Sequence, residues 1–530
     1  MIYVKKGTQM EYIDYYGLDF FKQNAEFTHE ENPLMEDNVF IERKKCPEDA
    51  PVPTFEEAKD ILPVPHWEGH EDYISCYWRA WEIGFKNVLK LVPNTGFVSN
   101  FIDTAFNGCI FMWDSSFTLM FGKYADRIFK FQKTLDNFYS HQHIDGFICR
   151  EIEEWTGKDH FTRHDPSATG PDIMTWCEWE YYQNFGDKTR LSEVFIPLMA
   201  YHRWMREHHT WPDGTYFSTG WGCGMDNIRR VDKGYHTMYS HGHSVWVDAC
   251  MQELLNCNIL IEMARIVGRE EFIPELTDER DMLRNVINEK LWDEKSEFYY
   301  DLWRGNKFSG IKHIGAYWGL LAKCADKERA DKLIAHLENE NEFKTPNRVP
   351  ALSRDMEEYS PDGDYWNGGV WPPTTYMVLK GLDAYEKFDL SHEIGKDYLY
   401  STVETYKETN TLFENYAPEF VNNGKPWKGE PARPNFVGWS GIGPISIMFE
   451  YVFGIKPDAE NKKITWHVNL LERHGIEKYP FGTEGTLTLM CEKRENENDI
   501  PCVTVESNVP VTVEIIYGEK ANRKKIVIEK

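Results

Sequence analysis

Apolar residues recur at helical spacing through most of this chain, from about residue 76 to residue 453. In the stretch 245–268, for example, they form one face with a period of 3.6 residues, and the stretch ends at Gly268, a residue type that often terminates helices. Strand-like segments do not alternate with these stretches, which disfavours a TIM barrel. The pattern predicts a mainly α-helical fold, with helices over 76–92, 117–139, 173–186, 190–209, 245–268, 276–291, 312–325, 326–338, 371–386, 391–409 and 443–453.

The pattern changes after Gly454, where segments such as "KKITWHVNL" and "VPVTVEIIYG" alternate or are rich in β-branched residues. These segments predict a small antiparallel β module. At the other end of the chain, the first 70 residues are acidic and interrupted by prolines, which indicates an extended arm. The predicted domains are therefore an N-terminal arm (1–70), a helical domain (71–454) and a C-terminal β module (455–530).

The balance of charge excludes two classes of partner. The formal net charge is −27, from 59 Lys and Arg against 86 Asp and Glu. Nucleic acids and anionic membranes bind basic surfaces, so we expect neither as a partner. No apolar run reaches the roughly 18 residues of a membrane span, and the N-terminus lacks a signal-peptide pattern. The eleven cysteines are scattered without a CxxC pair, which is typical of reduced thiols in a cytoplasmic protein.

Long loops rich in Trp, Gly, Asp and Pro separate the predicted helices. Loops of this length are usually functional, and the chain has 19 Trp, whose flat faces suit the C–H faces of sugar rings. Motifs for a catalytic zinc, a hydrolase serine, a P-loop or a dinucleotide are absent from the sequence. The loops span 93–114, 140–172, 210–243, 345–370 and 410–442.

Several of these loops place an acid beside aromatic and glycine residues. Each acid also has an ordinary structural explanation: Asp114 as a helix N-cap, Asp226 as part of an Asx turn and Glu414 as a solvated side chain. The repetition of the pattern favours a ligand site instead. The candidate residues are Trp113, Asp114, Arg150, Glu151, Trp221, Asp226, Trp366, Asn367, Gly368, Trp371, Glu414, Tyr416 and Trp439.

Two carboxyl groups and stacking surfaces are what glycoside hydrolysis requires. One carboxyl must stay protonated to donate to the leaving oxygen, and burial against aromatic groups raises its pKa. Asp226 follows "GWGCGM", so Trp221 and Met225 can supply that apolar environment. A nearby arginine would lower the pKa, so we expect Arg229 and Arg230 to point away from Asp226.

The motifs "FMWDSSF", "GCGMDNIRR", "YWNGGVWPPTTY", "TLFENYAPE" and "GWSGIGP", in this order, resemble the inverting (α/α)6-barrel glycosidases. This clan includes glycoside hydrolase family 63, with processing α-glucosidases and mannosylglycerate hydrolases, and the trehalases of family 37. The resemblance covers roughly residues 70–455. It implies an (α/α)6 toroid as the catalytic domain.

The resemblance also implies roles for the candidate residues. Asp226 matches the general acid of the family, and Glu414 matches the general base. Trp113 and Asp114 match a pair that contacts the sugar in the −1 subsite. The residues that match the segment lining the same pocket are Trp366, Asn367, Gly368 and Trp371.

The chain departs from the family pattern at three points. Asn367 stands where Arg is common, and Ile228 stands where Ser or Tyr is more usual. The large N-terminal β-sandwich of the processing α-glucosidases does not fit into residues 1–70. These departures leave the catalytic pair in place but argue against the specificity of the processing α-glucosidases, and the chain is closer in size to the mannosylglycerate hydrolases.

The resulting hypothesis is an inverting, exo-acting glycosidase that cleaves a terminal sugar, α-linked by resemblance, from an oligosaccharide or small glycoside. The alternatives are another enzyme on the same toroid, namely an α-L-rhamnosidase, an unsaturated glucuronyl hydrolase or a sugar epimerase, and a non-catalytic sugar-binding protein. The chemistry requires no cofactor and no metal, although the sequence leaves a loop-bound calcium open. The sequence contains no pattern that indicates the oligomeric state.

Overall fold

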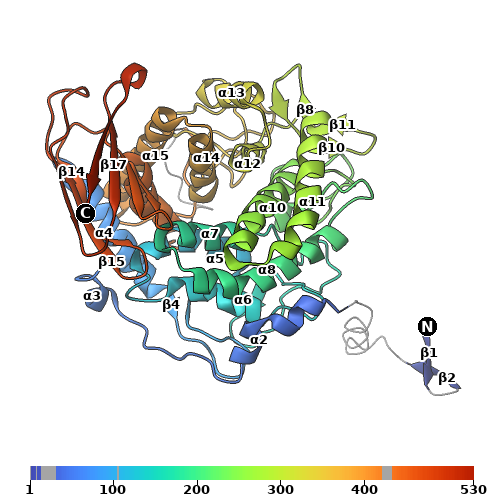
Figure 1. Ribbon diagram of the computed structural model, residues 1–530. Coiled ribbons are helices and arrows are strands. Elements are labelled where there is room, and N and C mark those ends of the chain that lie inside the picture. The colour runs from blue at the N-terminus through green and yellow to red at the C-terminus, as the bar shows by residue number, and fades with distance from the viewer. Residues whose placement is uncertain (1, 7–8, 14–30, 104–106, 420–432) are drawn as a thin grey trace.

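The computed structural model describes residues 2–6, 9–13, 31–103, 107–419 and 433–530. Parts of the predicted arm and of the predicted loops 93–114 and 410–442 lie outside these residues. Helices form a ring around a common centre in Figure 1. Its main members are α4 (Glu71–Lys86), α5 (Met112–Gly122), α7 (Met174–Phe185), α8 (Lys188–His208), α10 (Val247–Val267), α11 (Ile273–Val286), α12 (Trp318–Leu321), α13 (Lys327–Ala335), α14 (Pro372–Ala384), α15 (Phe388–Thr409), η8 (Trp439–Ile442) and η9 (Gly443–Val452).

The inner helices of this ring contact one another in a closed sequence. Helix α5 packs against α7, α7 against α10, α10 against α12, and α12 against α14. Helix α14 packs against η8 and η9, which return to α5 and so close the ring. The remaining long helices pack outside: α4 and α15 against η9, α8 against α7 and α10, and α11 against α10. The ring therefore has an inner and an outer layer of helices.

Local signals in the sequence explain where the helices begin and end. Helix α8 starts after Asp187, whose carboxylate accepts hydrogen bonds from the backbone N–H groups of Thr189 and Arg190. Helix α10 ends at Gly268, which has a positive φ of 74° and confirms the predicted C-cap. Ten of the eleven predicted helices have a helical counterpart of matching position, although their ends differ by several residues. The sequence periodicity thus identified the helical segments.

The prediction of one helix over 117–139 is wrong. Helix α5 ends at Gly122, where a Cβ atom would lie only 2.9 Å from Cβ of Phe131, so the chain turns back on itself there. Lys123 is also buried, and its ammonium lies 2.9 Å from a carboxylate oxygen of Glu450. Because the turn is fixed by these long-range contacts, local periodicity could not detect it.

Short helical turns fill the connections between the main helices. They are η1 (Pro33–Asp37), α2 (Val39–Arg43), α3 (Phe55–Ala58), η2 (Lys123–Ala125), η3 (Phe131–Leu135), α6 (Asp136–Ser140), α9 (Gly220–Cys223), η4 (Glu270–Phe272), η5 (Ile287–Leu291), η6 (Ile314–Tyr317), η7 (His336–Glu338) and η10 (Lys520–Asn522). Two-stranded ribbons are formed by β1 (Ile2–Lys6) with β2 (Gln9–Ile13), β4 (Val88–Leu89) with β5 (Phe101–Ile102), β6 (Cys109–Phe111) with β7 (Glu151–Glu153), β8 (Trp292–Asp293) with β9 (Phe298–Tyr299), and β10 (Leu302–Trp303) with β11 (Lys307–Phe308).

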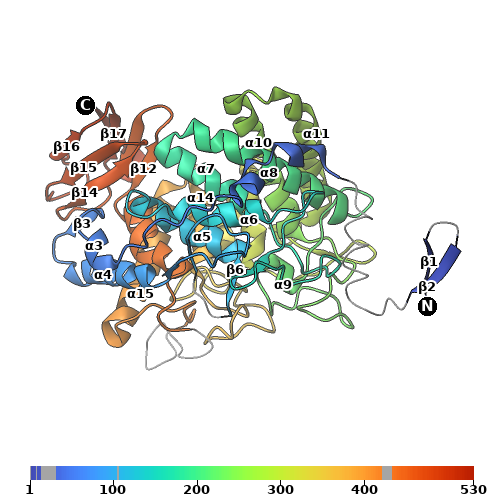
Figure 2. The same cartoon turned by 90° about the horizontal axis from the view of Figure 1, so that it is seen from below.

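The C-terminal segment folds into two four-stranded sheets that lie to one side of the helices (Figure 2). One sheet has the order β12-β13-β17-β18, and the other has the order β16-β15-β14-β3. Strands β13 and β17 run parallel, so the prediction of a purely antiparallel module is wrong. The edge strand β3 (Val64–Trp67) comes from the N-terminal arm. The others are β12 (Ile455–Asp458), β13 (Lys463–His467), β14 (His474–Phe481), β15 (Gly485–Cys491), β16 (Val503–Ser507), β17 (Thr512–Tyr517) and β18 (Lys524–Glu529).

None of the helices in the described part of the chain combines the length and the apolar character that a membrane crossing requires.

Candidate active site

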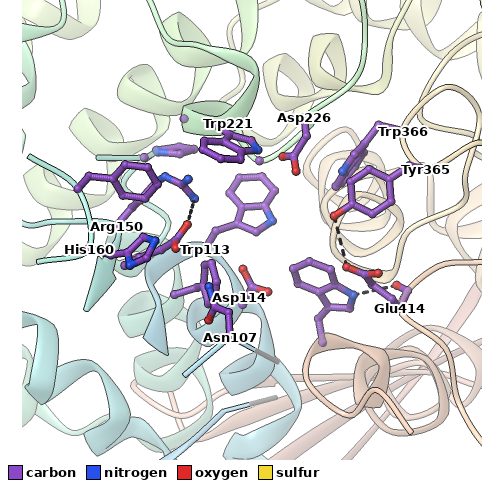
Figure 3. A pocket seen from close by; sticks show the side chains of 18 of the residues that line it. Asn107, Trp113, Asp114, Arg150, His160, Trp221, Asp226, Tyr365, Trp366 and Glu414 are labelled. Atoms are coloured by element: carbon purple, nitrogen blue, oxygen red, sulfur yellow. Dashed lines mark hydrogen bonds and ion pairs between the residues drawn. The ribbon is translucent and has the colours of Figure 1, made fainter. Parts of the chain in front are cut away.

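A cavity of about 290 Å³ opens among the long loops at one end of the helical ring. Its wall draws on segments that are far apart in sequence: the start of α5, the β7 strand, the loop around α9, the loop before α14, and the segments on both sides of residues 420–432 (Figure 3). Nine of the residues that the sequence indicated meet there: Trp113, Asp114, Arg150, Glu151, Trp221, Asp226, Trp366, Glu414 and Trp439.

The glycines before Asp226 allow its loop to pack closely on the cavity floor. Gly224 has a positive φ of 77°, and a Cβ atom there would lie 3.0 Å from Cε2 of Trp113. A Cβ atom on Gly220 would lie 2.6 Å from the backbone oxygen of Asp226. The short helix α9 starts at Thr219, whose side chain accepts a hydrogen bond from the N–H of Gly222. Close packing of the backbone therefore explains this glycine-rich stretch.

Burial raises the pKa of Asp226 to about 7, the positive charge of Arg150 opposes this shift, and the negative charge of Glu151 adds to it. Arg230 points away from Asp226, as expected. It is fully buried and pairs with Asp248 and Asp301, each at 2.6 Å. Asp226 can therefore hold a proton near neutral pH.

Glu414 is buried on another wall of the cavity. Its Oε1 atom accepts a hydrogen bond from the Tyr365 hydroxyl at 3.4 Å and pairs with Arg433 at 2.9 Å, whereas its buried Oε2 atom has no hydrogen-bond partner among the described residues. Trp439 donates a hydrogen bond from its indole N–H to the backbone oxygen of Glu414 at 2.9 Å. Burial raises the pKa of Glu414 to about 7, Arg433 opposes this shift, and Asp226 adds to it.

Two further carboxyl groups face the same space. Asp114 lies inside the first turn of α5 and does not cap it, because Phe111 occupies the cap position. Burial raises the pKa of Asp114 well above its usual value, and the nearby charge of Glu414 adds to the shift. Glu151 pairs with Arg150 at 2.6 Å, and the Arg150 guanidinium lies over the ring of Phe161 at 4.5 Å. Four carboxyl groups with different surroundings, those of Asp114, Glu151, Asp226 and Glu414, therefore line one cavity.

Four of the indicated residues are not in the cavity wall. Trp371 stacks behind Trp366, with ring centroids 3.8 Å apart and planes 2° apart, so it supports the lining ring. Asn367 donates a hydrogen bond to Asp364 within its own loop. Gly368 leaves no room for a side chain, because a Cβ atom would lie 2.8 Å from the backbone oxygen of Ser360. Tyr416 is buried, and its backbone pairs with Val370 beneath the loop.

Several other residues line the cavity but were not predicted from the sequence. Tyr365 precedes Trp366 in the same motif and has a positive φ of 63°, a conformation that non-glycine residues adopt mainly at functional or strained positions. Arg433 reaches Glu414 from 19 residues further along the chain, which no local pattern indicates. The remaining side chains of this kind are Asn107, Phe111, His160, Phe161 and Pro171.

Two groups of side chains among the described residues could hold a metal ion. Cys109, Glu151 and His160 bring their ligand atoms within 4.8 Å of one another beside the cavity, and His202, Cys257 and Glu279 do so in the buried core. Both groups contain a thiol and an imidazole, which suit zinc better than calcium.

Comparisons with known proteins identify the family of the domain that contains this cavity. A family model described as the mannosylglycerate hydrolase MGH1-like glycoside hydrolase domain matches residues 110–430, more than half of the chain, including Asp226 and Glu414. The chain belongs to this family of glycoside hydrolases. The resemblance that the motifs indicated is confirmed.

Relatives of this MGH1-like glycoside hydrolase are distant. An uncharacterized protein of Borreliella burgdorferi is 25% identical over 389 residues, which cover 72% of this chain and 78% of the relative. A probable mannosyl-oligosaccharide glucosidase of Schizosaccharomyces pombe is 25% identical over 208 residues, which cover 36% of this chain and 24% of that protein.

The solved structures that resemble this chain in fold include two glycosidases. The mannosylglycerate hydrolase of family 63 from Thermus thermophilus, in complex with glucose, has a TM-score of 0.55 and 19% identity, with 69% of this chain and 98% of that chain covered. The neutral trehalase of Saccharomyces cerevisiae has a TM-score of 0.53 and 13% identity, with 67% of this chain and 74% of that chain covered. Both likenesses show that this chain shares the helical fold of these two proteins.

The packing of Gly224 on Trp113 leads to a testable prediction for this MGH1-like glycoside hydrolase. Gly224→Ala should lower both the free energy of unfolding and the hydrolytic activity, because the new methyl group displaces the Trp113 ring. Gly268→Ala is a matched control, since Gly268 has a φ of 74° but no atom within 4 Å of the added Cβ. The control should lose about 1 kcal/mol of stability from backbone strain alone. Thermal unfolding and initial rates measure the two effects, and equal activity in both variants would contradict the explanation.

Proposed function

We propose that this protein is an inverting, exo-acting glycoside hydrolase that removes a terminal α-linked glucose or mannose, with Asp226 as general acid and Glu414 as general base. The observation that carries this proposal is that both carboxyl groups line one cavity, Glu414 buried and Asp226 half-buried, each with its pKa raised to about 7. A group with such a pKa can hold or release a proton at neutral pH.

The environments of the two acids support different roles for them. Glu414 is held through Oε1 by Tyr365 and Arg433, and Arg433 favours its ionised form. Its Oε2 atom is left to accept a proton from a water molecule. Asp226 would donate its proton to the glycosidic oxygen while this water attacks the anomeric carbon from the opposite face. Inversion requires the two carboxyl groups roughly 6.5–9.5 Å apart, with room for the water between them.

The form of the cavity supports removal of a single terminal sugar. Its volume of about 290 Å³ lies at the small end of ligand pockets, and four tryptophan rings contribute to its wall. These rings are Trp113, Trp221, Trp366 and Trp439. Glucose or mannose is the proposed sugar because the family model is named for mannosylglycerate hydrolase, and a similar solved structure contains glucose.

Two cationic side chains in the wall make an acidic substrate the second candidate. Arg150 and Arg433 both line the cavity, and a uronide or a glycerate leaving group would carry a carboxylate for them. Each arginine, however, already pairs with a carboxylate of the protein, Glu151 or Glu414. We therefore favour a neutral sugar in the pocket. No described residue of the cavity wall specifically favours the rhamnosidase, epimerase or non-catalytic hypothesis.

A hydrolysis screen tests the proposal. The substrates are α-linked gluco- and mannodisaccharides, mannosylglycerate, glucosylglycerate and an unsaturated uronide, with the anomer of the released sugar followed by NMR. Release of the inverted anomer from a neutral or glycerate-linked α-glycoside would support the proposal. Release of the retained anomer would exclude the inverting mechanism, and cleavage of the uronide alone would favour the second candidate.

The proposal extends to architecture and location. We infer that the outer and inner helices pair as six hairpins of an (α/α)6 toroid, supported by the closed sequence of inner contacts. The eleven cysteines are free, and nine of them are buried, which is consistent with a reducing, cytoplasmic environment. The chemistry proposed for Asp226 and Glu414 uses no cofactor.

The pKa values predict a bell-shaped dependence of kcat/KM on pH. Glu414 must be ionised, so activity should fall as the pH drops below about 7, and Asp226 must be protonated, so activity should fall as the pH rises above about 7. Arg433 lowers the pKa of Glu414, so Arg433→Ala should move the acid limb to higher pH, whereas Arg433→Lys should move it less. A pH–rate profile of the three proteins measures this shift. An acid limb that stays in place or moves to lower pH would contradict the assignment of Glu414 as the base.

A further inference from the structure

Trp155 exposes its side chain at the end of a ribbon that leads away from the cavity. The side chain is 71% exposed, and no other tryptophan in the described part of the chain is classed as exposed. Strands β6 and β7 form this ribbon: Phe111 pairs with Glu151 at the cavity end, and Cys109 pairs with Glu153 at the far end. Trp155 follows two residues later. A single exposed aromatic residue is common on protein surfaces, so its surroundings must decide whether it has a role.

One edge of the Trp155 ring lies near the backbone. A Cβ atom on Gly108 would lie in ordinary contact with the Trp155 ring, 3.5 Å from the indole nitrogen, so the ring lies close to the turn at Gly108. Gly108 has a φ of 76°, which an L residue adopts only with strain. The ring is therefore close to this turn at the indole nitrogen and mostly open to solvent, so it is available for stacking on an apolar sugar face.

A second hollow, of about 600 Å³, lies beside the ring and adjoins the cavity. Trp155, Gly108 and Phe101 contribute to its wall, and Asn107 lines both the hollow and the cavity. Asn107 is labelled in Figure 3 at the edge of the cavity, near Asp114. The four residue-to-residue steps from Glu151 to Trp155 span at most about 14 Å, which is within reach of a short oligosaccharide.

A residue in the wall of the same hollow has a buried polar atom that is unpaired among the described residues. Glu154 is 5% exposed, lines the hollow, and has no hydrogen-bond partner for its Oε1 atom among the described residues. Buried polar atoms are nearly always paired, and a hydroxyl group beside this oxygen would give it the donor that it lacks among the described residues. Sugar hydroxyls are such donors, and the ring faces between them are apolar.

We propose that Trp155 and the hollow beside it form a second sugar subsite, which binds a ring on the leaving-group side of the scissile bond. This inference rests on the proposed function and refines it: the substrate is an oligosaccharide, with its terminal sugar in the cavity and a more distant ring stacked on Trp155. Asn107 lines both the cavity and the hollow, so one glycan can occupy the two spaces at the same time. For this reason the proposed occupant of the hollow is a glycan and not a partner protein.

Binding measurements with an uncut ligand test the subsite. In the Asp226→Asn background, the affinities of glucose, maltose, maltotriose and maltotetraose, and of the matching α-mannose series, are measured by calorimetry. We expect affinity to rise with chain length, and Trp155→Ala to weaken binding of the longer members by about tenfold, a loss of roughly 1.4 kcal/mol. Tyr400→Ala, which removes an exposed aromatic ring on α15, is the matched control and should leave every affinity unchanged.

A second measurement gives a result even if the Trp155→Ala variant does not fold. Hydroxyl-radical footprinting reads the oxidation of Trp155 by mass spectrometry, and maltotetraose or the mannotetraose should protect it whereas the monosaccharide should not. Affinity that does not rise with chain length in either series, or Trp155 that stays equally oxidised in saturating tetrasaccharide, would overturn the subsite. Hydrolysis of short α-glycosides would then still support the proposed function, whereas no hydrolysis of any glycoside would count against the function itself.

Discussion

Asp226→Asn should reduce kcat on α-linked disaccharides by about 10³-fold, because general acid catalysis contributes 10²–10⁴-fold when the leaving group needs a proton. The substitution keeps the size of the side chain and removes the proton that the carboxyl holds near neutral pH. The loss should fall mainly on kcat, since the sugar still fits the same cavity.

A substrate that needs no proton separates this role from a general loss of structure. Fluoride leaves without protonation, so Asp226→Asn should hydrolyse the matching α-glycosyl fluoride at a rate close to that of the wild type. Asp232→Asn is the control, because Asp232 lies in the same loop but not in the cavity wall. An equal loss on the fluoride and on the disaccharide would show that Asp226 is not the general acid.

The same variant should be more stable than the wild type at alkaline pH. Burial raises the pKa of Asp226 to about 7 in the folded protein, above its value of about 3.9 in an unfolded chain. Stability is therefore lost as the pH rises from about 4 to 7, because ionising the carboxyl is harder in the folded state. Asparagine has no such penalty, so unfolding at pH 8 should require roughly 1–4 kcal/mol more in the variant. Thermal unfolding at pH 5 and pH 8 measures the difference.

Glu414→Gln should also reduce kcat by about 10³-fold, but here the loss should extend to the glycosyl fluoride. The attacking water must lose a proton whatever the leaving group, and glutamine cannot accept it. The comparison of the two variants on the two substrates therefore assigns the acid and the base independently. Rates by fluoride release and by glucose or mannose release provide the measurement.

A control variant in the same segment tests whether the loss of activity in Glu414→Gln comes from a disturbed structure. Glu419→Gln changes a glutamate five residues further on, which hydrogen-bonds Tyr359 and lies outside the cavity wall, and it should keep the activity of the wild type. Activity of Glu414→Gln that survives on either substrate would mean that another carboxyl is the base. Asp114 is then the next candidate, since it faces the same cavity.

Local patterns in the amino-acid sequence located the helical segments and most of the side chains that meet in the cavity. Patterns with a period of 3.6 residues located helices such as α10. An amphipathic helix must bury one face, and this requirement places apolar residues at regular spacing within the helix's own sequence. The motifs around Trp113, Asp226 and Glu414 indicated a sugar-cleaving site because few reactions use only acids and aromatic rings. Nine of the indicated residues line one cavity for this reason.

Contacts between distant parts of the chain, in contrast, fix which residues face the cavity and which support them. Within one motif, Trp366 lines the cavity while Trp371 stacks behind it, a distinction that depends on the fold of the loop. The break after α5 depends on Lys123 reaching Glu450, more than 300 residues away. Arg433 reaches Glu414, and so lowers its pKa, only because two segments are brought together in space. Contacts between distant segments determine how deeply each acid is buried and which charges lie near it. Burial and nearby charge in turn determine the pKa of each acid, and a local sequence pattern contains no information on either.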